Sequence, residues 1–192
     1  PYTIGFENLT MITNMNRLYT TSLFDEINST EDIVAKIAEL TATDNYNFPM
    51  ADRMTSHNLQ SQITGDNRVL IQGWGPRIGI NNHYSFLLIK EVTAVGGGDY
   101  KVVFDIKFVD HDARTEAANT SGQNVVIDNP GYDPSNEIVE YKEVELTTEI
   151  GAGKKNWFSA YADPEMVTFT QEEARGKSNM MDFAPVVHAN DE

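Results

Sequence analysis

The sequence contains no cysteine, and this absence excludes several kinds of chemistry at once. Disulfides, thiolate nucleophiles, zinc–thiolate sites and iron–sulfur clusters all require that residue. Long hydrophobic runs are also missing, since no stretch approaches the ~18 apolar residues needed to span a bilayer. The start, Pro1-Tyr2-Thr3, lacks the basic and apolar regions of a signal peptide and suits removal of an initiator methionine. We therefore expect a product made in the cytoplasm, without a membrane anchor.

Basic residues are scarce. The chain has 14 Lys and Arg against 29 Asp and Glu, which gives a formal net charge of −15. Such a charge repels phosphate backbones and anionic lipid surfaces, so we expect no direct nucleic-acid partner and no membrane partner. The acidic excess instead favours solubility, cations or a basic protein partner.

The length of 192 residues and the lack of repeats or linkers predict a single domain over residues 1–192. The pattern is mainly β, and at most α+β. It predicts an antiparallel β-sandwich or barrel-like body with one short packing helix and extended terminal arms. The arms cover residues 1–27 and 170–192, where apolar residues follow no clean period. We expect such arms to become ordered against a neighbouring subunit.

The helix is predicted over residues 30–40. Ser29 followed by Asp32 resembles a capping box, and Ile33, Ile37 and Leu40 share one stripe. These features are typical of a helix that packs one face against the body.

A β-hairpin is the strongest local pattern in the chain. Residues 83–92 and 100–109 are rich in β-branched and aromatic side chains, and they flank a glycine turn at residues 96–99. In the second arm, alternation predicts one buried face and one mostly solvated face. The buried face holds Val102, Phe104, Ile106 and Phe108; the solvated face holds Lys101, Val103, Asp105 and Lys107.

A later strand over residues 136–148 changes its polar phase midway. The change falls at Lys142 and Glu143, and it predicts a β-bulge there.

Two acidic loops are candidates for binding a hard cation. Carboxylates two to five residues apart with a glycine for the bend suit Ca²⁺, although neither loop has EF-hand spacing. Asp, Asn and Gly are also the ordinary residues of β-turns, so turn chemistry is the alternative. The candidate ligands are Asp110 and Asp112 in one loop and Asp128, Asp133, Asn136 and Glu137 in the other.

Three further features are candidates for binding or catalysis. Trp74 and Trp157 would suit a sugar-stacking surface, or else the core or a subunit interface. Lys154 and Lys155 form the densest basic spot, which in an acidic chain points to contact between copies. His83 heads the first hairpin strand, and with Asp105 on the returning strand it resembles the imidazole arrangement of papain-like hydrolases, but their cysteine nucleophile is absent.

No catalytic set is complete and no cofactor motif is present, calcium being the one ion the residues suggest. The combination predicts a non-enzymatic structural subunit that self-assembles through its β-body and terminal arms, for example a virion capsid, tail-tube or decoration protein. Its partners would be further copies or other structural subunits. Two alternatives stay open: a carbohydrate- or ligand-binding β-sandwich, and a hydrolase of unrecognised type that uses His83.

Overall fold

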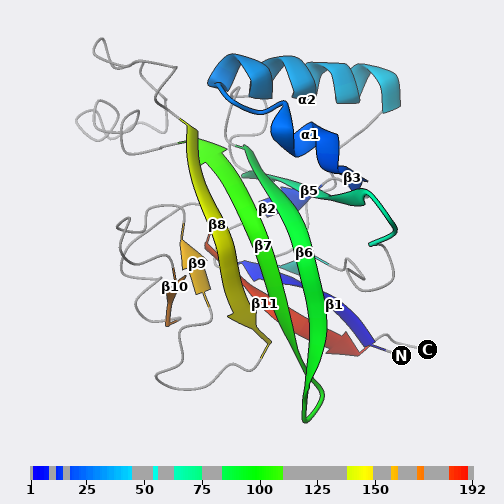
Figure 1. The fold of residues 1–192 in the computed structure, drawn as a ribbon, viewed down its shortest axis with the longest axis vertical. Coiled ribbons are helices and arrows are strands. Elements are labelled where there is room, and N and C mark those ends of the chain that lie inside the picture. Colours follow the sequence, from blue (N-terminus) through cyan, green and yellow to red (C-terminus); the bar gives the residue numbers. More distant parts are fainter. Residues whose placement is uncertain are drawn as a thin grey trace.

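The fold is mainly antiparallel β-structure arranged in layers, as the sequence predicts. A central sheet carries helices on one face and a second sheet on the other (Figure 1). The computed structural model describes residues 2–8, 12–14, 18–44, 54–55, 63–74, 84–109, 138–148, 157–159, 168–170 and 182–189.

The central sheet is built around the predicted hairpin. Five strands follow one another across it, and the short β3 (Tyr19–Thr20) also pairs with β5. All of its pairs are antiparallel. In order across the sheet the strands are β2 (Ile12–Asn14), β5 (Asn67–Trp74), β6 (Tyr84–Gly96), β7 (Asp99–Val109) and β8 (Ile138–Thr147).

The second sheet brings together segments from the two ends of the sequence. Here β1 (Tyr2–Asn8) pairs antiparallel with β11 (Asp182–Ala189) over all of β1 and residues 183–189 of β11. The sheet has five strands. The others are β10 (Thr168–Phe169), β9 (Trp157–Ser159) and β4 (Met54–Thr55).

The predicted terminal arms are extended only in part: β1 and β11 contact each other, whereas residues 21–25 of the first arm form a short helix. Phe6 of β1 and Phe183 of β11 are both fully buried, with ring centroids 5.1 Å apart. These two apolar side chains thus have partners within the same chain. Contact of the arms with another subunit stays a prediction.

An aromatic core fills the space between the sheets. Phe104 on β7 lies beside rings from the second sheet, at centroid distances of 6.3 Å to Phe6, 6.2 Å to Phe158 and 5.7 Å to Phe183. The contacts with Phe6 and Phe158 are edge-to-face, and such contacts add to the free energy gained by burying the rings. All four side chains are 0% exposed. The face of β7 predicted to be buried is buried.

The opposite face of β7 is also largely covered, so the prediction that it is mostly solvated is wrong. Val103 is 7% exposed, and Asp105 and Lys107 are 6% exposed. Lys107 lies under α1 (Thr21–Asp25), where its Nζ donates a hydrogen bond to the Phe24 carbonyl at 2.8 Å. The same Nζ lies 4.5 Å from the centroid of the Phe24 ring, a cation–π distance.

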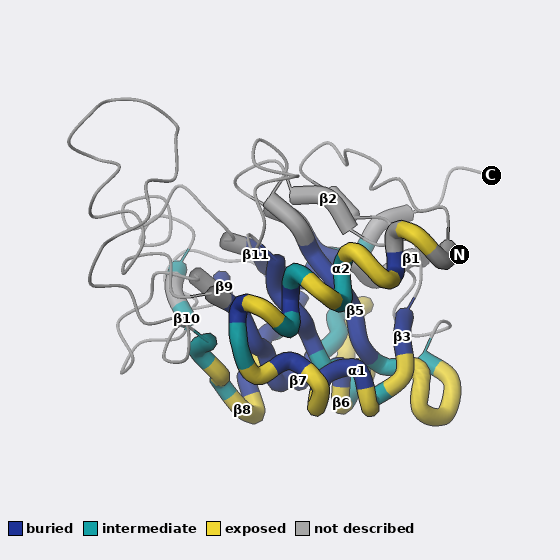
Figure 2. Tube along the Cα trace, turned by 90° about the horizontal axis from the view of Figure 1, so that it is seen from above, coloured by how far each residue is buried: buried dark blue, intermediate teal, exposed yellow. Residues whose placement is uncertain are grey.

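The helices cover one end of this face (Figures 1 and 2). The helix α2 (Thr30–Asp44) begins where predicted and runs past residue 40. Its N-terminus is capped as expected, because Ser29 Oγ accepts from the Asp32 amide at 3.2 Å. Ile33 and Leu40 are buried against β5 and β6.

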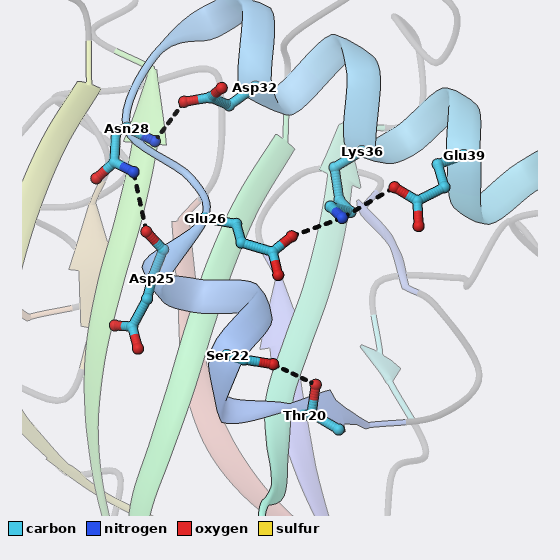
Figure 3. Close-up of polar contacts among 8 residues, drawn as sticks. All are labelled: Thr20, Ser22, Asp25, Glu26, Asn28, Asp32, Lys36 and Glu39. Atoms are coloured by element: carbon cyan, nitrogen blue, oxygen red, sulfur yellow. Dashed lines mark hydrogen bonds and ion pairs between the residues drawn. The ribbon is translucent and has the colours of Figure 1, made fainter.

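Lys36 joins the two helices. Its Nζ lies 2.6 Å from Glu26 Oε2, just after α1, and 2.9 Å from Glu39 Oε2 on α2 (Figure 3). These carboxylates, Glu26 first, raise the pKa of Lys36 above its ordinary value. The helix layer is thereby held together at its outer surface.

Candidate functional site

The surroundings of the β6–β7 hairpin change at the level of Asp105 on β7, where both neighbouring strands, β6 and β8, carry a bulge. On the β6 side the register passes from Ile89 opposite Phe104 to Glu91 opposite Val103, which leaves Lys90 as an extra residue. On the β8 side Phe104 faces Val144 and Ile106 faces Tyr141, so two β8 residues lie across from Asp105. The second bulge is the one that the sequence predicts.

The carboxylate of Asp105 holds both bulges. Its Oδ1 accepts a hydrogen bond from the Glu143 amide at 2.8 Å, and its Oδ2 lies 3.2 Å from Lys90 Nζ. Lys90 also pairs with the Glu143 carboxylate. Glu143 has a φ of 54°, a strained value for a residue with a side chain, and the Asp105 hydrogen bond stabilises it there. The two carboxylates, Glu143 first, raise the pKa of Lys90.

Arg68 marks the end of the pairing between β5 and β6. The register of those strands ends at Val69 opposite Leu88. Beyond that point the backbone of β6 is bound by the Arg68 side chain. Its Nη1 donates to the carbonyls of Ile89 at 3.4 Å and Lys90 at 3.2 Å. Nε of the same side chain donates to the Gly65 carbonyl at 2.9 Å.

Residues 91–96 of β6, which follow the two carbonyls that Arg68 binds, form what we call the distal edge. They pair with β7, and no other described strand pairs with them. From Thr93 to Gly98 every residue is exposed, and the hairpin tip extends beyond the second sheet in Figure 1. Val95 is 54% exposed and is the one exposed large hydrophobic side chain among those described.

The distal edge carries little net charge. Glu91 is its one charged residue, and its Oε1 lies 3.2 Å from Lys101 Nζ on β7. A hydrogen bond from Thr93, together with one from Lys101, lowers the pKa of Glu91. At the tip, Gly97 and Gly98 have φ values of 66° and 88°, which the predicted glycine turn requires.

The other flank of the hairpin is protected by β8. Pairing continues from Val109 down to Lys101, and the Thr148 amide then donates to the Tyr100 carbonyl at 2.8 Å. The outer side of β8 carries a bulge and exposed charges, features that oppose pairing with a further strand. The exposed charged residues are Glu140, Lys142, Glu143 and Glu145.

The predicted cation loops lie outside the described residues. This applies to Asp110, Asp112, Asp128, Asp133, Asn136 and Glu137. Within the part of the chain that the structure describes, no group of three or more His, Asp or Glu is placed to hold a metal ion. A calcium site in these loops stays a prediction.

The other predicted site residues are not brought together. Lys154, Lys155 and His83 lie outside the described residues, as does the side chain of Trp74. Trp157 is 0% exposed, so its ring offers no surface for stacking a sugar in this structure. Asp105, the acidic neighbour considered for His83, lies opposite Leu88 and is bound by Lys90 and the Glu143 amide.

The comparisons with known proteins give no family for this chain. No family model matches it, and neither a curated protein nor a solved structure matches it. Within the described ranges, no helix has the length and apolar character needed to cross a membrane.

Sequence reasoning missed the distal edge and the residues around it. Arg68 and Lys90 read as ordinary polar positions at a strand end and in an alternating strand. The one signal near this site was the phase change at Lys142, because it predicts the bulge whose Glu143 amide Asp105 binds.

Proposed function

We propose that the protein is a non-enzymatic structural subunit that self-assembles, of the kind found in a virion capsid, tube or surface layer. The single observation that supports this most is the distal part of the β6–β7 hairpin. It extends beyond the second sheet, exposes Val95, and has a strand edge that no described strand covers. An uncovered edge of this kind is a ready template for pairing with another chain.

The net charge of the chain also favours the tip of the β6–β7 hairpin as the contact surface between copies. Two copies that each carry a formal charge of −15 repel one another over most of their surfaces. The segment from Thr93 to Gly98 has no charged residue, and the adjacent Glu91 is paired with Lys101. Approach at this segment therefore costs less electrostatic free energy than approach at the helices, where Glu26, Glu31 and Glu39 are exposed.

The terminal segments take a different part in this proposal from the one first expected. Because β1 and β11 pair with each other, these two segments are held within one subunit, in the second sheet. The proposal therefore assigns the main contact between subunits to the hairpin, with any further contact of the arms as a secondary one.

The oligomeric state of the purified chain tests the proposal. Light scattering coupled to size exclusion, at several protein concentrations, is expected to show species larger than one 21.5 kDa chain. Raising the salt concentration should favour assembly, because salt screens the repulsion between the acidic copies. A monomer at every concentration and salt level would contradict the proposed function.

A further inference from the structure

We propose that the distal edge pairs antiparallel with the distal edge of a second copy, which joins two central sheets into one. This inference rests on the proposed function and names the surface that self-assembly would use. It concerns residues 91–96 of β6, the stretch between the Arg68 contacts and the glycine turn.

The distal edge has the backbone groups that strand pairing needs. Along an edge strand, alternate residues direct their N–H and C=O groups away from the neighbouring strand and leave them to solvent. The regular part of the distal edge, Glu91 to Ala94, spans about 13 Å of extended chain. The register with β7 then shifts between Ala94 and Gly96, and Gly96 has a φ of 101° at the start of the turn. Arg68 closes the edge on one side by binding the Ile89 and Lys90 carbonyls, and the turn at Gly97 closes it on the other.

The symmetry of such a pair can be worked out from the faces of β6. Val92 and Ala94 lie opposite Val102 and Tyr100, on the face toward the second sheet. A two-fold axis perpendicular to the sheet makes the strands antiparallel and keeps that face on the same side in both copies. Residues directly opposite must then share a face, so the residue at the axis lies opposite its own copy. Placing the axis between the two Thr93 residues or between the two Ala94 residues centres the pair on the distal edge.

Either register avoids opposing like charges. With the axis at Thr93, Glu91 lies opposite Val95 of the second copy, and two threonines face each other, a favourable cross-strand pair. With the axis at Ala94, Glu91 lies opposite Gly97 of the second copy. A second copy is thus a complementary occupant, and the neutral edge brings the acidic chains together where their repulsion is weakest.

The outer edge of β8 does not offer the same site. Self-pairing there would bring Glu140, Glu143 and Glu145 near the same residues of a second copy, and like charges across a strand pair are destabilising.

Single cysteines test the inference, because the natural chain has none and each variant carries one thiol. Residues opposite one another in antiparallel strands have Cα atoms about 4.5–5.5 Å apart, within the range that a disulfide bridges. We expect Thr93→Cys or Ala94→Cys to shift to the mass of a covalent dimer on a non-reducing gel under mild oxidation. The matched control is Glu145→Cys, an exposed position on β8, which should stay at the monomer mass.

The outcomes separate this inference from the proposed function. If the natural chain assembles but neither cysteine variant cross-links, or if Glu145→Cys cross-links as readily, another surface makes the contact and the distal-edge inference is wrong. If the natural chain is a monomer throughout, the proposed function and the inference are both wrong.

Thr93→Glu, compared with Ala42→Glu on the exposed side of α2, adds a second readout, since both add one negative charge. Thr93→Glu should reduce the fraction of assembled chain and Ala42→Glu should not; equal effects would contradict the inference.

Discussion

The two halves of the β6–β7 hairpin are alike in sequence and differ in surroundings. The half nearest Tyr84 and Val109 has helices on one face and the second sheet on the other, with β5 and β8 alongside. The distal half, beyond Lys90, keeps β8 alongside but loses β5, and its tip is exposed on all sides. Both halves carry β-branched residues and alternate between faces.

This difference shows that the role of a strand depends on where its neighbours end. The pairing of β6 with β5 ends at Leu88, and the Asp105 carboxylate with the two bulges marks the same level of the sheet. The inner half is expected to contribute to folding stability. In the distal half Val102 and Val103 are still buried, and only the exposed tip from Thr93 to Gly98 is expected to contribute little to stability; this tip is the part proposed to associate.

The largest effect is expected from the core of the inner half. Phe104→Ala removes a fully buried ring that contacts three others, and it should lower the free energy of unfolding by about 3–5 kcal/mol. Urea denaturation measures the change. The control is Val95→Ala in the distal half, where the exposed side chain should change stability by less than about 0.5 kcal/mol. Similar losses for both variants would remove the distinction between the halves.

The next effect concerns the boundary between the halves. Asp105→Ala leaves the Glu143 amide without its described acceptor and Lys90 with the Glu143 carboxylate alone, and it should cost about 1.5–3 kcal/mol. Asp105→Asn keeps an oxygen acceptor and should cost less. Urea denaturation of the two variants tests this order, and equal stabilities would show that the hydrogen bond to the bulge contributes little.

A smaller effect is expected at the tip. Gly98→Ala places a side chain at a φ of 88°, with no atom within 4 Å of the added Cβ, so any loss arises from backbone strain rather than from a clash. The cost should be about 1–2 kcal/mol. Thermal or urea unfolding measures it, and an unchanged stability would mean that the turn has another conformation.

The pH dependence of the folding stability should show the contribution of the Lys90 ion pairs. Its pKa is raised in the folded chain by Glu143 and Asp105, so the charged amine stabilises the fold. That stability is fully present below the unfolded pKa of about 10.4 and is lost as the pH rises through the higher folded value. The stability difference between the natural chain and Lys90→Met should therefore shrink in that alkaline range. A difference that stays constant would show that the ion pairs do not carry the effect.

Local pattern predicted much of the fold. The hairpin and its glycine turn, the capped start of α2 and the bulge at Glu143 all follow from spacing within a short stretch of sequence. The covered face of β7 did not, because Lys107 is a polar residue in an alternating strand and is buried only by α1, whose five residues show no helical period. The pairing of β1 with β11 joins opposite ends of the chain, and nothing in either segment specifies that partner.

The candidate site was less predictable than the fold. A strand edge is free where the neighbouring strand ends. The distal edge therefore depends on where β5 ends relative to β6, and not on its own residues. The exposed Val95 is one signal in the sequence, but an isolated valine beside a glycine turn is ordinary. The acidic loops and basic pair were visible in the sequence, and their roles stay predictions.

Amide hydrogen exchange at low and high protein concentration tests the central claim most directly. If the distal edge pairs with a second copy, alternate amides within residues 91–96 should become protected as the concentration rises. The amides of residues 140–145 on the outer edge of β8 should not change. Protection that appears on β8 instead, or assembly that leaves residues 91–96 unprotected, would contradict the account.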